Sequence, residues 1–211
     1  MIHLIVTCTR RKTVDAGGTI FPSGKDAGTA YEIWRERLAQ ACSANPLITA
    51  GELYAGQHWN RASDAAKRNG AELWIISAGL GLLHVTDRIV PYEATFSSMP
   101  FRSRDIWTLL ITRPPTKRRC PSFYALMRGR PHDRFVIAAS PVYLRAVEDD
   151  LCAGRDALTS PDQLTIVTSK GYQGCLSRSV TLASAAMMGT LNTNLTGLNV
   201  SYAAQLIERS A

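Results

Sequence analysis

The chain has 211 residues, of which 45% are hydrophobic, and it carries a formal net charge of +7. This length is sufficient for one hydrophobic core, so we expect a single domain over residues 1–211. No apolar run approaches the roughly 20 residues that span a bilayer, and the first residues lack the pattern of a signal peptide. We therefore expect a cytoplasmic protein with no membrane partner, and we favour a monomer.

The positive charge is concentrated in one stretch. Between Phe101 and Arg134, nine Lys or Arg residues stand against two acidic residues, which accounts for the whole net charge. Clustering of one sign is typical of segments that contact nucleic-acid phosphates, although a solvated insertion shows the same pattern. Under the first interpretation, the candidate DNA-binding residues are Lys117, Arg118 and Arg119.

The cysteine pattern indicates no metal site. The five cysteines are odd in number, and no two are spaced as Cys-x-x-Cys. We predict neither a disulfide framework nor a zinc site, and we expect no metal or cofactor.

Apolar periodicity and turn residues predict an alternation of strands and helices. In chain order, we expect a strand at 2–7, helices from Tyr31 to Cys42 and from Trp59 to Asn69, a strand at 73–76, a strand at 135–139, a helix after Ser140-Pro141, a strand at 164–168, a helix over about 175–188 and a last helix around 198–206. This order predicts an α/β fold with a central, mainly parallel sheet of four strands. The basic stretch at about 101–134 is expected as an insertion between the second and third strands.

Ligands bind beyond the carboxyl ends of strands in such sheets, and small, polar or charged residues follow all four strands. After the first strand comes Cys8-Thr9-Arg10-Arg11-Lys12, whose amides and cations suit a phosphate. A solvated basic turn is the alternative. We expect Cys8 to be a packed residue and not a nucleophile, because no histidine is placed near it.

Two aromatic segments follow. Tyr54 and Trp59 stand before a helix, where an aromatic ring can stack on a base or fill the core; we assign Trp59 to the core, leave Tyr54 open and expect His58 at the surface. After the second strand, Gly79 and Gly81 follow Ser77 and allow a backbone to approach a ligand closely.

A turn with a carboxylate completes this region. Pro91-Tyr92-Glu93 places a carboxylate beside an aromatic ring, and such a carboxylate can act as a general base or stabilise a developing cation. A structural turn with a surface Glu is the alternative. After the last strand, Lys170 can supply charge at an anion or a leaving group, unless its segment is a plain loop.

The combined motifs resemble a known family. Cys-Thr-x-x-Lys, Leu-Tyr-x-Gly-x-x-Trp, Ile-Ser-Ala-x-x-Gly-Leu-Leu and Ile-x-Pro-Tyr-Glu-x-Thr follow one another over about residues 2–96, as in the bacterial DUF6884-type family. That family is similar to the N-glycosidase-like domain of archaeosine synthases and, through it, to the uracil-DNA glycosylase superfamily. Some relatives are anti-phage glycosylases that remove glucosylated cytosines. The resemblance implies a three-layer α/β/α sandwich, and this chain departs from the family pattern where Gly79-Leu80 replaces a polar pair.

The resemblance also implies a mechanism without a metal. Cleavage of an N-glycosidic bond needs a carboxylate near the anomeric carbon, a cation or donor at the base, and a ring to stack on it. We expect Glu93, Lys170 and Thr9 to be catalytic and Tyr92 to stack on the base. The other expected substrate-binding residues lie in the same loops: Cys8, Arg10, Arg11, Lys12, Tyr54, Ser77, Gly79, Gly81, Ser140, Tyr143 and Ser169.

We therefore expect a DNA glycosylase that excises a bulky modified pyrimidine from phage DNA. Two alternatives stay open: a hydrolase or transferase of free nucleotides or nucleosides, and a non-catalytic nucleic-acid-binding module. Dependence on the charge of Glu93 separates an enzyme from a binding module.

Overall fold

The computed structural model describes residues 1–209 and shows a mixed α/β fold built around a six-stranded sheet. The strand order is β4-β3-β1-β6-β7-β8. The bounds of these strands are β1 (Ile2–Thr7), β3 (Glu72–Ser77), β4 (Gly81–His84), β6 (Arg134–Ala138), β7 (Leu164–Thr168) and β8 (Val180–Leu182). All neighbouring pairs are parallel except β3 and β4, which are antiparallel. A separate pair joins β2 (Ile48–Thr49) to β5 (Arg88–Ile89).

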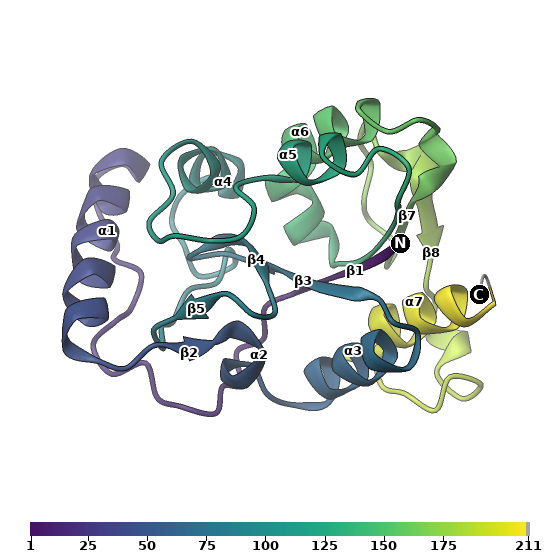
Figure 1. The fold of residues 1–211 in the computed structure, drawn as a ribbon, viewed down its shortest axis with the longest axis horizontal. Helices are drawn as coiled ribbons and strands as arrows, with labels where there is room; N and C mark the ends of the chain where they lie inside the picture. Colours follow the sequence, from purple (N-terminus) through teal and green to yellow (C-terminus); the bar gives the residue numbers. More distant parts are fainter. Residues whose placement is uncertain (210–211) are drawn as a thin grey trace.

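Helices cover both faces of the sheet and give the three layers of an α/β/α sandwich (Figure 1). One face carries α3 (Gln57–Arg68) and α7 (Leu198–Glu208), which pack against each other. The other face carries α4 (Ser103–Thr112), α5 (Phe123–Arg128) and α6 (Pro141–Asp156), with α1 (Ala27–Ala44) beside α4. The short helix α2 (Ala50–Leu53) precedes α3.

All four predicted strands are present, but the predicted number of strands is wrong because the sheet has six. The four-residue strand β4 forms a tight hairpin with β3, so its antiparallel pairing extends the sheet without a crossover helix. The three-residue strand β8 lies within the segment that we predicted as a helix over about 175–188. That prediction is wrong as well, since short 3₁₀ turns flank β8 at Ser177–Ser179 and Ala185–Met187.

The basic stretch is part of the layered fold and not a loop added to it. It supplies α4 and α5, which pack on α6 through the buried carboxylate of Asp150. This carboxylate accepts hydrogen bonds from the Trp107 indole at 3.1 Å and from the backbone amides of Phe123 and Tyr124 at 2.9 and 3.0 Å. Burial raises the pKa of Asp150, and these donors act against that rise.

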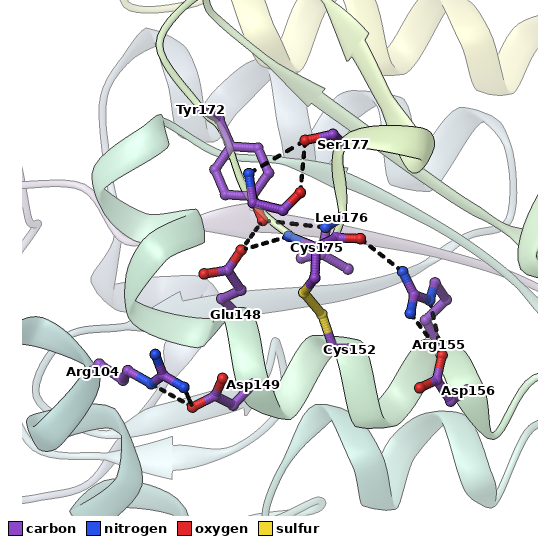
Figure 2. Close-up of a disulfide and its surroundings, with 11 residues drawn as sticks. Arg104, Glu148, Asp149, Cys152, Arg155, Asp156, Tyr172, Cys175, Leu176 and Ser177 are labelled. Atoms are coloured by element: carbon purple, nitrogen blue, oxygen red, sulfur yellow. Dashed lines mark hydrogen bonds and ion pairs between the residues drawn. A yellow bond between two sulfur atoms is a disulfide. The ribbon is translucent and has the colours of Figure 1, made fainter.

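A disulfide joins Cys152 on α6 to Cys175 in the loop after β7, a bond that was not expected when we predicted no disulfide framework (Figure 2). The spacing of the cysteines carries no signal for this bond, because the two residues lie 23 positions apart and meet only when α6 packs beside that loop. Glu148 on α6 accepts the hydroxyl hydrogen bond of Tyr172 and the amide of Cys175, the latter at 3.0 Å. The loop after β7 is therefore fastened to α6.

The strand order places a crevice at one edge of the sheet. From β1 the chain crosses to β3 on one side, and from β3 it returns past β1 to β6 on the other. The connections that leave β1 and β6 therefore diverge. The carboxyl ends of these two strands form a topological switch point, which is the usual ligand position in such sheets.

Candidate active site

A cavity of about 660 Å³ opens at this switch point. Its walls come from the segments that follow β1, β6 and β7 and from the segments that lead into α3 and α7: residues 7–11, 55–58, 138–140, Ser169, 195–196 and 198–199. A volume of this size lies within the range of small-molecule sites, roughly 300–1,000 Å³. The structure therefore confirms that polar residues after three separate strands meet at one hollow.

Three helices begin at the cavity, and none of their N-cap residues makes a side-chain capping hydrogen bond: Gly56 before α3, Ser140 before α6 and Gly197 before α7. The backbone N–H groups in the first turn of these helices are therefore available to other hydrogen-bond acceptors, and the helix dipoles add positive potential. Gly56 has a φ of 97°, a conformation that favours glycine. Together with Arg10 and Arg11 in the cavity wall, these helix starts make this edge of the sheet attractive to anions.

Arg10 and Arg11 also line a second hollow of about 640 Å³. Its other lining residues are Glu93, Thr95, Ser97 and Ser98. The two arginines thus stand between the strand-end cavity and a hollow that contains a carboxylate. This arrangement brings Glu93 and the first-strand loop together, as the sequence predicted.

Backbone pairing holds Glu93 in position on both sides. Its amide donates to the Thr19 carbonyl, and its carbonyl accepts from the Phe21 amide, both at 2.9 Å. The Lys12 ammonium lies 3.0 Å from Glu93 Oε2, and the backbone of Lys12 pairs with Tyr54. The Lys12 side chain is 6% exposed, whereas that of Glu93 is 38% exposed. The carboxylate is therefore oriented by a buried cation and still open to a ligand.

A layer of buried hydroxyl groups lies under this ion pair. The Tyr92 hydroxyl is 2.6 Å from that of Tyr54 and 2.5 Å from Ser77 Oγ, which also accepts the Leu80 amide at 2.9 Å. The Lys12 ammonium lies 5.3 Å from the centre of the Tyr92 ring. Burial raises the pKa of both tyrosines, so their hydroxyls stay protonated.

The structure corrects the roles predicted for these three residues. Tyr92 and Ser77 are fully buried, and Tyr54 is almost fully buried. The two tyrosine rings therefore cannot stack on an incoming base. The sequence pattern could not separate a stacking ring from a packed one, because an aromatic residue in a strand-end motif suits either place. Their role is to support Lys12 and Glu93 from below.

Gly79 and Gly81 are also not free for the close approach of a ligand that the sequence predicted. A Cβ at Gly79 would meet Ala94 and the Tyr92 ring at 2.8–2.9 Å, and the Trp34 indole donates to the Gly79 carbonyl at 2.7 Å. Gly81 has a φ of 84°, and the Arg118 guanidinium occupies the place of its missing Cβ. Both positions need glycine for packing, and Gly81 needs it for backbone conformation as well.

Cys8, Thr9 and Tyr143 lie at the cavity or just behind its wall. Cys8 Sγ is 3.2 Å from the Tyr143 hydroxyl, and burial raises the pKa of the Cys8 thiol, which disfavours the nucleophilic thiolate. Thr9 lines the cavity, and its hydroxyl donates to the Arg11 carbonyl at 2.8 Å, which leaves its oxygen lone pairs available. Ser140 and Ser169 also line the cavity, whereas the exposed Lys170 is not among its lining residues.

The predicted DNA-binding residues are placed elsewhere. Arg118 donates to the carbonyls of Leu80, Leu110 and Pro121, and Arg119 pairs with Glu72 at 3.2 Å. Glu72 begins β3, so Arg119 lies at the amino ends of the strands, opposite the cavity, whereas the Arg118 guanidinium lies beside Leu80 and Gly81, just beyond the carboxyl end of β3. The Arg118 guanidinium therefore has a structural role, whereas Lys117 remains exposed.

The lining residues that were missed as site residues include Gln57, His58 and Asn199. His58 was expected at the surface but is half-buried in the cavity wall, with Nδ1 3.3 Å from the Thr196 carbonyl. Burial lowers the pKa of His58. The signal that points to these residues is their position in the first turns of α3 and α7, which needs the packing of those helices to be recognised.

The sequence profile of a family of unknown function, DUF6884, matches residues 41–163, more than half of the chain. The chain belongs to DUF6884. The matched part of this DUF6884 protein includes the Tyr54–Tyr92 layer and Glu93, but not the first-strand loop or α7. No curated protein matches the chain. No helix among residues 1–209 is both long and apolar enough to cross a membrane.

Proposed function

We propose that this DUF6884 protein is a DNA glycosylase that excises a bulky modified pyrimidine, such as a glucosylated cytosine, from phage DNA as an anti-phage defence. The main support is the arrangement around Arg10 and Arg11. These cations separate a strand-end cavity large enough for a base from a hollow in which Glu93 is open to solvent. A base, its sugar and the flanking phosphates require those three environments side by side.

The proposed reaction is hydrolysis of the bond between the base nitrogen and the anomeric carbon of the sugar. When that bond breaks, its electron pair leaves with the base and positive charge develops on the sugar. The Glu93 carboxylate stabilises this charge and accepts a proton from the attacking water, whose oxygen bonds to the anomeric carbon. Lys12 keeps the carboxylate in one orientation, 3.0 Å from its ammonium.

A base within a duplex is stacked and paired, so the enzyme extrudes it or acts on single strands, at a cost of about a few kcal/mol. Arg10 and Arg11 at the boundary of the cavity offset part of that cost by holding the phosphates on either side. The volume of about 660 Å³ leaves room for a substituent on the base. We therefore expect a bulky pyrimidine to be preferred over plain uracil.

One experiment tests the proposal. The protein is incubated with unmodified DNA and with DNA that contains glucosylated hydroxymethylcytosine, and alkali-labile abasic sites are then counted. We expect abasic sites in the modified DNA alone, and their formation about a hundredfold or more slower with the Glu93→Gln variant. If the wild-type protein leaves both DNAs intact, and uracil-containing DNA as well, the glycosylase proposal is wrong.

A second candidate function is a hydrolase or transferase of free nucleotides, because three helix starts at one cavity suit a terminal phosphate. Turnover of nucleoside monophosphates without turnover of DNA identifies this alternative. The third possibility, a non-catalytic nucleic-acid-binding module, predicts that Glu93→Gln binds DNA like the wild type and that neither protein forms products.

A further inference from the structure

The walls of the strand-end cavity indicate which part of a nucleotide it takes. Ala55, Ala138, Ala139, Leu195 and Leu198 supply apolar surface, and the cations lie on the side shared with the Glu93 hollow. An apolar cavity with a few oriented polar groups suits a heteroaromatic ring better than a bare phosphate. The polar groups that can recognise such a ring are therefore the amide side chains of the cavity wall.

Asn199 presents a hydrogen-bond acceptor to this cavity. Its Nδ2 lies 3.2 Å from the Ala139 carbonyl, at the end of β6. A carbonyl only accepts, so the atom of Asn199 that faces it must be the NH₂ group. The amide oxygen of Asn199 is then left for a donor on a ligand.

Gln57 presents the opposite polarity, because a chain of hydrogen bonds determines its orientation. The Gly197 amide, which only donates, lies 3.0 Å from the Asn194 side chain and therefore faces its oxygen, Oδ1. The Nδ2 of Asn194 in turn donates to Gln57 Oε1 at 2.8 Å. The NH₂ group of Gln57 is thus left for an acceptor on a ligand.

The two amides are held in one frame. Gln57 begins α3 and Asn199 lies in the first turn of α7, and these helices pack against each other. His58 adds a hydrogen bond across the same junction, to the Thr196 carbonyl. The acceptor and the donor are therefore carried by two helices in direct contact, which favours the defined spacing that discrimination between base edges requires.

We infer that the strand-end cavity holds the base and that Asn199 and Gln57 read its edge, the first as an acceptor and the second as a donor. This inference rests on the proposed function. The chemistry recognised is an N–H group next to a ring acceptor. Cytosine offers it as the 4-amino group beside N3, and uracil offers it as N3–H beside a carbonyl.

Binding of four nucleotides tests the inference without any turnover. The probes are dCMP, its analogue without the 4-amino group, dUMP and its N3-methyl analogue, measured by calorimetry. We expect the wild-type protein to lose about tenfold in affinity when the N–H group of the recognised base is removed, equivalent to about 1.4 kcal/mol. The pair that shows this loss identifies a cytosine-type or a uracil-type edge.

Two variants assign the loss to the named residues. With Asn199→Ala, we expect parent and analogue to bind alike, whereas a structural disturbance would weaken both and keep their ratio. With Gln57→Glu, the donor becomes an acceptor while Asn194 keeps its partner, and we expect the parent nucleotide to bind at least tenfold more weakly. Asn60→Asp is the matched control, because it adds the same charge to an exposed position of α3 outside the cavity wall.

The inference is overturned if Asn199→Ala keeps the tenfold ratio, if Gln57→Glu binds like Asn60→Asp, or if none of the four nucleotides binds at millimolar concentration. Its failure is distinguishable from that of the proposed function. Abasic sites formed in modified DNA with unchanged selectivity in both variants would contradict base reading and leave the glycosylase proposal standing. If the predicted binding ratios are found but no DNA acquires abasic sites, base reading is supported and the glycosylase proposal is contradicted.

Discussion

The Lys12 ammonium and the Glu93 carboxylate lie 3.0 Å apart, yet their surroundings differ: the lysine is 6% exposed and the glutamate 38%. The Tyr92 ring lies beneath the ammonium, and the backbone of Lys12 pairs with Tyr54. A cation held from below in this way directs the carboxylate without covering it. The pair therefore behaves as one unit in which Lys12 positions Glu93.

The first prediction concerns the charge of Glu93. The Gln side chain in Glu93→Gln retains an oxygen that accepts the hydrogen bond from Lys12, so the melting temperature should change by only a few degrees. Excision should fall by about a hundredfold or more, the scale of a lost general base. Rates of abasic-site formation, together with thermal unfolding, measure both effects. An unchanged rate would remove Glu93 from the mechanism.

The second prediction concerns Gly81. The Ala side chain in Gly81→Ala has to adopt a φ of 84° and displace the Arg118 guanidinium, which would leave carbonyl groups of Leu80, Leu110 and Pro121 without their donor. We expect a loss of about 3 kcal/mol or more in the free energy of unfolding, from backbone strain and from the loss of donors to the partly buried carbonyls of Leu80 and Leu110. Excision should then fall through stability and not through the shape of the pocket.

Gly70→Ala is the matched control for Gly81→Ala. Gly70 also has a positive φ, 59°, but a Cβ there meets nothing within 4 Å. Its loss should be about 1 kcal/mol, from the backbone conformation alone. Equal losses for the two variants in urea denaturation would show that Arg118 does not depend on the glycine.

Much of the fold follows from local patterns. Each apolar, β-branched run became a buried strand, and Ser140-Pro141 begins α6 as predicted. The strands β4 and β8 were missed because they have four and three residues, too few for a periodic signal, and because pairing with β3 and β7 stabilises them. Pairing with a neighbouring strand, and not a local pattern of residues, therefore determined those two elements.

The candidate site was predictable where it depends on strand ends and not where it depends on helix packing. The rule for parallel sheets located Cys8, Arg10, Arg11, Ser140 and Ser169 at the cavity. Asn199 and Gln57 reach it only because α3 and α7 lie side by side. The buried place of Tyr92 depends on hydroxyl partners from other segments, which the sequence does not reveal.

The third prediction is that stability falls on mild acidification. His84 is 4% exposed, and its pKa is lowered by burial and, second, by the Arg119 guanidinium; burial also lowers the pKa of His3. The unfolded chain protonates these rings near pH 6.5, whereas the folded chain keeps them neutral. The contribution of the two neutral histidines to the free energy of unfolding is therefore complete above about pH 6.5. It is lost as the pH falls from there toward the pKa of each ring in the folded protein, by up to about 1.4 kcal/mol per pH unit for each proton.

The variant His84→Gln isolates this effect. Asp150 acts in the opposite direction, because burial raises its pKa, so the comparison must be made between variant and wild type at each pH. Urea denaturation between pH 7.5 and 5 should show a smaller loss for His84→Gln than for the wild type. Parallel curves would show that His84 does not titrate differently in the two states.

The fourth prediction concerns the disulfide between Cys152 and Cys175. It closes a loop of 23 residues, which corresponds to about 3 kcal/mol of stabilisation through the entropy of the unfolded chain. We expect Cys152→Ser to lose that amount and to become insensitive to dithiothreitol, whereas the wild type loses it on reduction. Cys42→Ser, at a free cysteine, should keep the wild-type response to the reductant. A wild-type protein unaffected by dithiothreitol would contradict the prediction.

The last prediction separates the two groups of basic residues. Arg10 and Arg11 line the cavity, whereas Arg119 lies at the opposite edge of the sheet, where it pairs with Glu72. Lys117 lies in the same segment as Arg119.

Each phosphate contact adds about 0.7–0.9 to the magnitude of the slope of log affinity against log salt concentration. We expect Arg10→Glu and Arg11→Glu to weaken binding to every DNA sequence. Each variant should reduce the magnitude of that slope by the value of about one phosphate contact. Lys117→Glu and Arg119→Glu, which make the same charge change, should leave affinity and slope near the wild-type values. The reverse result would move the DNA-binding surface to the basic stretch at 101–134.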